Sequence, residues 1–522
     1  MSAAQSEVVI GELRARSAAV VRIAPLVTAF SAGAALTLAF APLSWWPLAI
    51  VCPAVLIYLW NRASPRNAAW RGFWFNFGTF TFGTWWIYLG VHLNGGAPAW
   101  LALLLVFALS SIMSVYHAAL GYLVARFFSR GRLLRWMIVV PAAWLAIEWL
   151  RGWFLSGYSW MSLGYSQTDT WLGRFAPVLG VYGISALLLI SAGALAALAR
   201  GRGRERLIAL AVLALPWVAA ALLGQREWTH PSGAPVRVAI VQGAVSQDEK
   251  WLEANRDKTL ALYRRLTESV LGAPLIVWPE AAPPDLANNL VDYLGDLYRE
   301  AALKGSSLAL GIVRTTDDET SYYNSILAMS DGKVSWYSKN HLVPFAEFFP
   351  VPAFVRSWMR IMSLPYSDFE RGAAVQPPLA AGGLKLSASI CYEDGYGSAQ
   401  LPVLKQGADA LLNVTNDAWF GHSSARYQHF QIARMRAMEA QRFMIRAAND
   451  GVSGIIGPHG EVRAHATEYR PAVVQGTVTP RQGLPPYALY GNWLIIGLAL
   501  GTLVATTLWN LRVSSGSIAL QS

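Results

Sequence analysis

The sequence predicts a polytopic α-helical membrane domain joined to a layered α/β domain. Hydrophobic residues make up 54% of the 522 residues and charged residues only 14%, whereas about a quarter of an ordinary soluble protein is charged. Long apolar runs are concentrated before residue 230. Beyond that point, short β-branched runs alternate with polar helical stretches, which is the pattern of an α/β domain.

Seven apolar runs precede residue 230, and most approach the roughly 20 residues that a helix needs to cross a bilayer. They extend over residues 23–41, 45–60, 73–91, 98–124, 133–150, 175–198 and 207–223. An eighth run, residues 493–509, follows the α/β domain. Tryptophans near the run ends, such as Trp45 and Trp86, are typical of a membrane surface. We therefore predict about eight transmembrane helices.

The distribution of arginine predicts how these helices are oriented. Before His230 the chain has 17 Arg, no Lys and 6 acidic residues, so the net charge of +11 arises in the apolar half. Arginine is concentrated in alternate connections, at residues 14–22, 62–71, 126–135 and 200–206. Such connections face the cytoplasm. We therefore expect both termini in the cytoplasm, the α/β domain on the outer side of the membrane, and no nucleic acid as a partner.

The α/β domain is expected between Pro235 and Thr479. Eight runs are predicted to be strands: residues 236–243, 274–280, 307–314, 323–330, 334–339, 384–391, 410–416 and 443–449. Residues 248–271 and 285–304 are predicted to be helical. The chain is thus divided into a membrane domain with seven helices (1–230), the α/β domain (231–485), and a C-terminal transmembrane helix with its tail (486–522).

Three of the predicted strands end on residues that form a chemical set, namely Glu280, Lys339 and Cys391. A thiol becomes a good nucleophile only when it is deprotonated. A carboxylate at Glu280 could accept the proton, and the ammonium of Lys339 could stabilise both the thiolate and an oxyanion. His341 is a competing candidate for the base. The only other cysteine, Cys52, lies in an apolar run, so neither a disulfide nor a cysteine metal site is expected.

Three motifs surround this set. The segments WPEAAPP (278–284), YSKNHLVPFAEFFP (337–350) and SICYEDGYG (389–397) resemble the Glu, Lys and Cys motifs of the nitrilase superfamily. Together with seven preceding spans and one following span, they resemble the layout of the apolipoprotein N-acyltransferase family, whose members are membrane-embedded. The resemblance covers nearly the whole chain.

This resemblance implies an αββα sandwich whose active site lies on the periplasmic side of a bacterial inner membrane. It implies a ping-pong reaction in which Cys391 takes the sn-1 acyl chain of a phospholipid, typically phosphatidylethanolamine, as a thioester. The acyl chain then passes to the amine of an S-diacylglyceryl-cysteine at the N-terminus of an apolipoprotein. Glu280 would be the base, Lys339 the oxyanion-stabilising cation and Cys391 the nucleophile. We expect no cofactor and a monomer.

Further residues match positions that are implicated in substrate binding or support in the family. Glu347 matches a second glutamate near the site. The others are Trp251, Asn324, Tyr392, Glu393, Trp419 and Arg442. Tyr392 and Glu393 are expected to shape the pocket that receives the acyl carbonyl. Glu148 and Arg151 could pair and line a lipid entry path, and the alternative is that the Arg151 side chain extends to the membrane surface.

The aromatic-rich segment 345–369 is predicted to be a mobile lid that reaches toward the membrane surface. The alternative is a loop packed on the sheet.

Two other functions are compatible with parts of this pattern. A membrane-tethered amidase of the same superfamily would hydrolyse a small amide with the same three residues, but eight spans exceed what a tether needs. A transporter or receptor would use the outer domain only to bind a ligand. Transporters usually place several ionisable residues within their spans, and here Glu148 is nearly the only acidic one.

Overall fold

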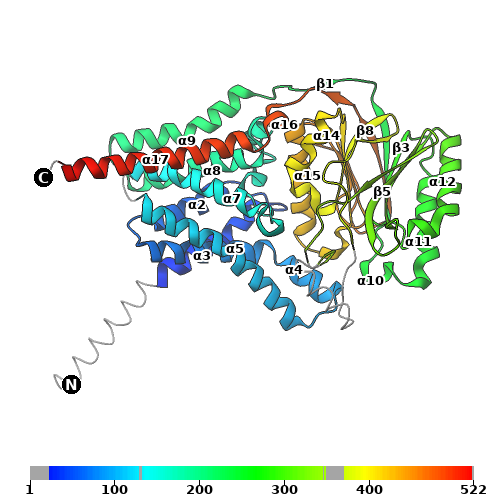
Figure 1. The fold of residues 1–522 in the computed structure, drawn as a ribbon, viewed down its shortest axis with the longest axis horizontal. Helices are drawn as coiled ribbons and strands as arrows, with labels where there is room; N and C mark the ends of the chain where they lie inside the picture. Colours follow the sequence, from blue (N-terminus) through cyan, green and yellow to red (C-terminus); the bar gives the residue numbers. More distant parts are fainter. Residues whose placement is uncertain (1–22, 129–131, 345, 349–368, 520–522) are drawn as a thin grey trace, which may run out of the picture.

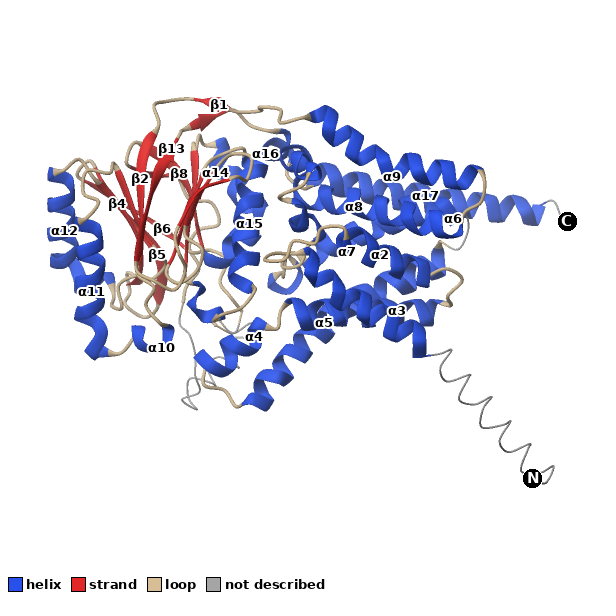
Figure 2. Cartoon of the chain, turned by 180° about the vertical axis from the view of Figure 1, so that it is seen from behind, coloured by secondary structure: helices blue, strands red, loops and turns tan. Residues whose placement is uncertain are grey.

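The computed structural model describes residues 23–128, 132–344, 346–348 and 369–519. A bundle of helices forms one half of the molecule and two stacked β-sheets form the other, with α15 (Ala425–Ala440) between them (Figure 1). Figure 2 shows the same order from behind, with α11 (Glu253–Glu268) and α12 (Val291–Leu303) on the far face of the sheets.

The helical half contains a first helical stretch, residues 23–36, and the elements that follow it. These are η1 (Thr37–Ala39), α2 (Leu48–Leu59), α3 (Pro65–Gly83), α4 (Trp86–Leu89), η2 (Gly90–Asn94), α5 (Ala99–Phe127), α6 (Arg132–Leu134), η3 (Arg135–Val139), α7 (Val140–Arg151), η4 (Phe154–Ser156), η5 (Leu163–Gln167), η6 (Trp171–Phe175), α8 (Ala176–Arg200), α9 (Arg204–Leu223) and α17 (Trp493–Ala519).

Fewer helices have the length and apolarity of a membrane span than the sequence predicts. Within the described part of the chain, four helices are long and apolar enough to cross a membrane: Ala99–Phe127, Trp171–Arg200, Arg204–Leu223 and Trp493–Arg512. The helices at Ile23–Ala39 and Leu48–Leu59 are apolar but shorter. Eight spans therefore remain a prediction, whereas an extensive apolar helical domain is present.

The predicted span at residues 73–91 is wrong in its bounds. Helix α3 begins at Pro65, where the side chain of Ser64 accepts a hydrogen bond from the Asn67 N–H, a typical helix start. It ends at Gly83, and the chain then runs through α4 and η2 toward the α/β half, where the side-chain amide of Asn94 donates to the Trp419 carbonyl oxygen at 2.8 Å. The residues after the interruption therefore contact the second domain.

Glycines allow the helices of the bundle to approach closely. A Cβ on Gly72 of α3 would lie 2.2 Å from the His117 carbonyl oxygen of α5, and one on Gly121 of α5 would lie 2.4 Å from that of Ala68. Such small-residue contacts are common between membrane helices, because they let the backbones pack against each other.

The α/β half contains two six-stranded sheets, ordered β13-β2-β3-β4-β5-β6 and β12-β11-β10-β9-β8-β7. The first consists of β2 (Val236–Gln242), β3 (Leu275–Trp278), β4 (Ser307–Thr315), β5 (Tyr322–Ser330), β6 (Lys333–Ser338) and β13 (Ala472–Val478). The second consists of β7 (Leu379–Ala381), β8 (Leu384–Ile390), β9 (Ala410–Thr415), β10 (Met444–Ala448), β11 (Gly454–Ile456) and β12 (Val462–His465). A short pair, β1 (His230–Pro231) and β14 (Arg481–Gln482), closes the domain. All eight predicted strands are present.

The helices complete an αββα sandwich, as expected. The outer helices are α10 (Gln247–Lys250), α11, η7 (Ala287–Leu290) and α12, and the inner ones are η8 (Cys391–Gly395), η9 (Gly397–Gln400), α14 (Leu401–Lys405), η10 (Asp417–Phe420), α15 and α16 (Pro486–Tyr490). The predicted helix at residues 248–271 is broken at Trp251, and that at residues 285–304 begins as a 3-10 turn. Side chains such as Ile240 and Leu412 fill the space between the sheets.

Candidate active site

One edge of the first sheet gathers Glu280, Asn324 and Lys339. Glu280 lies just beyond the carboxyl end of β3, which is parallel to β4. Strands β5 and β6 run antiparallel in turn, with Val313 opposite Asn324 and Ser325 opposite Ser338. The start of β5 and the end of β6 therefore lie at the same edge, and the Lys339 N–H donates to the Asn324 carbonyl oxygen at 2.8 Å.

Lys339 is a buried cation between two carboxylates. Its side chain is 1% exposed, and its Nζ lies 2.8 Å from Glu347 Oε2 and 3.6 Å from Glu280 Oε1. The amide of Asn324 donates to Oε1 of both glutamates, at 2.7 and 3.1 Å. Burial alone would lower the pKa of Lys339, but the negative charges of Glu347 and Glu280 outweigh it and raise the pKa well above its usual value. Lys339 is therefore an ammonium ion at every physiological pH.

The two sheets meet at Glu280. Its Oε2 accepts a hydrogen bond from the Asn416 N–H at 2.8 Å, and Asn416 directly follows β9 of the second sheet. Strand β8, which leads into Cys391, runs parallel to β9. The carboxylate is thus fixed by donors from both sheets, and Cys391 comes from the strand next to one of them.

Cys391 begins a sharp turn out of β8. Its φ is +51°, a left-handed conformation that costs a side-chain-bearing residue free energy. The residue as a whole is partly exposed. Burial and the nearby Glu280 carboxylate raise the pKa of Cys391, while the positive charge of Lys339 acts in the opposite direction. The thiol is therefore protonated at rest, and a proton acceptor is needed before it can attack.

Glu393 anchors this turn. Its Oε1 accepts hydrogen bonds from the N–H groups of Asn340 and His341, at 2.7 and 2.9 Å. Its Oε2 accepts from the Tyr337 hydroxyl and the Ile390 N–H, both at 2.8 Å. The carboxylate therefore joins the residue before the cysteine to the segment that carries Lys339.

We expect Glu393→Gln to destabilise the protein by about 2–4 kcal/mol, because an amide NH2 would face two hydrogen-bond donors in a buried site. The melting midpoint, followed by tryptophan fluorescence in detergent, should fall by several degrees. Glu268→Gln is the matched control, since Glu268 is exposed and pairs only with Arg264 on α11. Equal midpoints for the two variants would show that the Glu393 contacts contribute little.

Tyr392 and Trp419 contact the helical half. The Tyr392 hydroxyl donates to the Gly157 carbonyl oxygen at 3.1 Å, so its ring extends away from the sheet edge toward the loop after α7. The indole of Trp419 is 43% exposed, and its carbonyl oxygen bonds to Asn94 of η2. Both residues border the junction between the helices and the cysteine turn.

The two remaining predicted supporting residues lie at different distances from this cluster. Trp251 follows α10 and is 51% exposed, and its ring lies 6.0 Å from Nζ of Lys250, which donates to the Glu280 carbonyl oxygen. Arg442 precedes β10, which is parallel to β8 and β9, so it lies at the opposite edge of the sheet from Cys391. Its guanidinium donates to the carbonyl oxygens of Ala408 and Gly483, which gives it a structural role.

The competing base, His341, is poorly suited to that role. Its ring stacks on Tyr396 with 3.9 Å between centroids. Burial, followed by the positive charges of Arg371 and Lys339, lowers the pKa of His341 to about 4. A group with that pKa is a weak proton acceptor near neutral pH.

In the described structure Glu148 and Arg151 form no direct ion pair, although the charge of Arg151 acts on Glu148. The Arg151 guanidinium donates to the carbonyl oxygens of Tyr158 and Trp160, at 3.0 and 2.6 Å. Glu148 accepts a hydrogen bond from the Ser185 hydroxyl at 2.6 Å. Arg151 therefore holds the loop that receives Tyr392. The predicted lid at residues 345–369 lies almost entirely outside the described residues.

A buried charged cluster next to Cys391 was missed by sequence reasoning. His429 of α15 lies with Asp394, Asp417 and Arg446, and each of the four side chains is at most 1% exposed. In the sequence, this cluster is marked only by a segment with many polar residues, RYQHFQIAR (426–434), and the burial of that segment is known from the structure.

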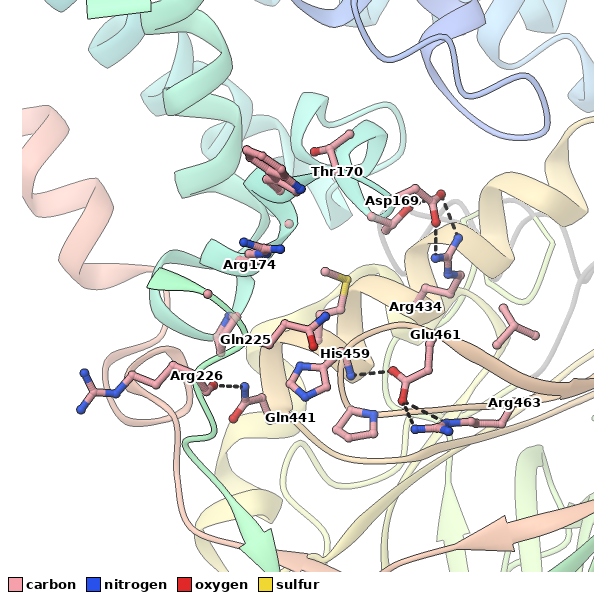
Figure 3. A pocket seen from close by; sticks show the side chains of 18 residues that line it. Asp169, Thr170, Arg174, Gln225, Arg226, Arg434, Gln441, His459, Glu461 and Arg463 are labelled. Atoms are coloured by element: carbon pink, nitrogen blue, oxygen red, sulfur yellow. Dashed lines mark hydrogen bonds and ion pairs between the residues drawn. The ribbon is translucent and has the colours of Figure 1, made fainter. Parts of the chain in front are cut away.

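A cleft of about 740 Å³ lies elsewhere, at the seam between the two halves. Figure 3 shows it between the segment from Asp169 to Arg174 and the residues that follow α9 on one side, and α15 with the loop at His459 on the other. Ion pairing of Arg434 with Asp169 crosses the seam. No residue of the Glu-Lys-Cys set lines this cleft. In the described part of the chain, no group of three His, Cys, Asp or Glu residues could hold a metal ion.

The fold and the site together define a carbon–nitrogen hydrolase domain built onto an apolar helical domain. The family model of the carbon-nitrogen hydrolases matches residues 237–482, and that of the apolipoprotein N-acyltransferase N-terminal domain matches residues 32–194. The chain belongs to the apolipoprotein N-acyltransferase family, because it is similar to members of that family over most of its length.

An apolipoprotein N-acyltransferase of Chromobacterium violaceum is 40% identical over 486 residues, which cover 92% of this chain and 93% of that protein. One from Methylococcus capsulatus is 39% identical over 477 residues, with 91% and 94% covered. Among solved structures, a carbon-nitrogen hydrolase from Helicobacter pylori aligns with 47% of this chain and 89% of its own, at 16% identity and a TM-score of 0.36. The family assignment rests on the sequence relatives.

Proposed function

We propose that this protein transfers an acyl chain from the sn-1 position of a phospholipid to the N-terminal amine of an S-diacylglyceryl-cysteine apolipoprotein. The arrangement of Lys339 between Glu280 and Glu347, at the edge where Cys391 leaves β8, is the observation that carries the proposal. It supplies an acceptor for the thiol proton and a fixed positive charge beside the nucleophile.

In the first half-reaction, the Cys391 thiol gives its proton to Glu280 and the sulfur attacks the ester carbonyl. The Lys339 ammonium stabilises the negative oxygen that forms. The C–O bond breaks, and Glu280 returns the proton to the departing glycerol oxygen, which releases lysophospholipid. The acyl chain is left on sulfur as a thioester.

In the second half-reaction, the apolipoprotein amine attacks the thioester. The C–N bond forms and the C–S bond breaks, while Glu280 accepts a proton from the amine and then restores the thiol. The same base therefore serves both steps. The α/β domain lies against apolar helices, which fits two substrates that both carry acyl chains.

The finer features follow the sequence analysis. We infer phosphatidylethanolamine as the donor, a monomeric enzyme, and a multi-pass location in a bacterial inner membrane with the catalytic domain in the periplasm. The arginine-rich connections support that orientation. The division of the chain at residues 230 and 485 is part of the same proposal.

Incubation of the purified protein with isotope-labelled phosphatidylethanolamine should add one acyl chain to Cys391. Peptide mass spectrometry should locate it, hydroxylamine should remove it, and a diacylglyceryl peptide should discharge it. An unmodified Cys391 in protein that hydrolyses a small amide would instead establish the amidase.

A further inference from the structure

The cluster behind Cys391 joins four elements that lie far apart in the sequence. His429 belongs to α15, Asp394 to η8, Asp417 to η10 and Arg446 to β10. Arg446 lies 2.9 Å from Asp394 Oδ2 and 3.2 Å from Asp417 Oδ2. Burial of these charges is costly unless each is paired, so the arrangement calls for a reason beyond packing.

Both ring nitrogens of His429 face carboxylates. Nδ1 lies 2.8 Å from Asp417 Oδ1 and Nε2 lies 3.0 Å from Asp394 Oδ1. A neutral imidazole has one N–H, so one of its nitrogens would present a lone pair to a carboxylate. Only the imidazolium can donate to both.

His429 also holds the cysteine itself. Its Nε2 lies 3.2 Å from the Cys391 carbonyl oxygen, and the side-chain amide of Asn413 lies 3.4 Å from the same atom. The left-handed φ of Cys391 is unfavourable in isolation. The single N–H on Nε2 is shared between this carbonyl and Asp394, and together with the Asn413 amide it fixes the direction in which the turn leaves β8, and thus the position of the thiol.

We propose that His429 is a positioning residue for the nucleophile: its imidazolium fixes the Cys391 carbonyl and cancels the carboxylate charge that would oppose formation of the Cys391 thiolate. This role rests on the proposed function of Cys391 as the acyl carrier. His429 touches neither substrate nor the reacting sulfur in this scheme.

The net charge of the cluster determines the direction in which loss of His429 would change thiolate formation at Cys391. Asp394 and Asp417 are negative, while Arg446 and His429 are positive, so the intact cluster is neutral. Loss of the His429 charge would leave one uncompensated negative charge beside the thiol, because Asp417 is among the groups that raise the pKa of Cys391. Thiolate formation would then require a higher pH.

The surroundings of His429 agree with an imidazolium. Burial and the positive charge of Arg446 lower the pKa of His429, but Asp394 and Asp417 outweigh them and raise it to about 9. Among the described residues, the rings of Trp160 and Phe420 also lie beside His429, and they carry no charge. The stability that comes from this protonation is fully present below about pH 6.5 and is lost as the pH rises through about 9.

The rate at which iodoacetamide alkylates Cys391, measured against pH by mass spectrometry, tests the proposal in a Cys52→Ala background. Between about pH 7 and 8, where His429 of the parent is an imidazolium, His429→Gln should lower the alkylation rate about tenfold, as expected for a rise of about one unit in the pKa of the thiol. His422→Gln is the matched control, because His422 is exposed and stacks on Tyr469. Its profile should equal that of the parent.

A charge-compensating pair of variants separates this role from a purely structural one. Asp417→Asn removes a negative charge, so its alkylation rate at about pH 7–8 should equal or exceed that of the parent. The double variant His429→Gln/Asp417→Asn is again neutral and should return close to the parent profile. If His429→Gln cannot be purified folded, the comparison of Asp417→Asn with the double variant gives the same answer.

A parental alkylation rate for His429→Gln at about pH 7–8, or a double variant that reacts more slowly than His429→Gln, would overturn the proposal. The alkylation assay needs neither phospholipid nor apolipoprotein. Failure of the proposed function would appear as an absent acyl adduct on Cys391 with the alkylation shifts intact, so the two failures are distinguishable.

Discussion

Replacement of Cys391 by alanine should abolish acyl transfer, with a fall in rate of at least roughly 10⁴-fold, which is the scale seen when a covalent nucleophile is removed. No described residue can take its place, because Cys52 is 3% exposed within α2. Alanine adopts the left-handed backbone no worse than cysteine, so the fold should persist. The measurement is N-acylation of a diacylglyceryl peptide, together with the acyl adduct detected by mass spectrometry.

Two comparisons make this result specific to the sulfur. Cys52→Ala should keep full activity. Glu280→Gln should bind phospholipid as well as the parent but form the acyl adduct slowly, since the amide cannot accept the thiol proton. Residual transfer by Cys391→Ala near the parental rate would remove the thioester from the mechanism.

Replacement of Lys339 by methionine should be the second most damaging change. Glu280 and Glu347 would then be buried without their cation, and the loss of one partner from a buried ion pair typically costs about 3–5 kcal/mol. The stabilising charge at the oxyanion would also be missing, which slows thioester formation by a further factor of roughly 10²–10³. Thermal unfolding and burst formation of the acyl adduct measure the two effects separately.

The double variant Lys339→Met/Glu347→Gln distinguishes stability from chemistry. It restores the net charge of the site, so the melting midpoint should recover most of its loss. Thioester formation should remain slow, because no ammonium faces the carbonyl oxygen. Recovery of both properties would mean that Lys339 only neutralises its neighbours.

The strands and the Glu280, Lys339 and Cys391 set could be predicted because their information is local. Each strand is a short β-branched run, and three of the runs end on a reactive side chain. Register then follows from strand direction: β3 ends and β5 begins at one edge, which brings Glu280 and Asn324 together without reference to the rest of the chain.

Helix α15 could not be predicted from periodicity. One of its faces packs on the second sheet, through Phe430 and Ala433, and another packs on the helical bundle, through Ile432 and Met435. Its polar residues, such as His429 and Arg436, are buried together with the apolar ones, so the alternation that identifies a surface helix is absent. The same burial conceals His429.

The orientations of the supporting residues also depended on the tertiary structure. Tyr392 bonds to the loop after α7, Arg442 lies at the far edge of the sheet, and Glu393 accepts hydrogen bonds from four donors that come from β6, β8 and the segment after β6. A motif gives the position of such residues along the chain. It does not give the direction of their side chains, which is set by contacts with other strands and loops and, for Tyr392, with the helical half.

The sequence by itself determined the apolar helical half, the αββα domain, the three reactive residues and the family to which they belong. Hydrophobic pattern and short motifs encode these features directly. Only the tertiary structure decided where α3 ends, how Lys339 is shared by Glu280 and Glu347, and that His429 lies behind the cysteine. These depend on charges that pair across long stretches of chain, such as Arg446 with Asp394 at a separation of 52 residues, and packing of the whole fold is what brings such partners together.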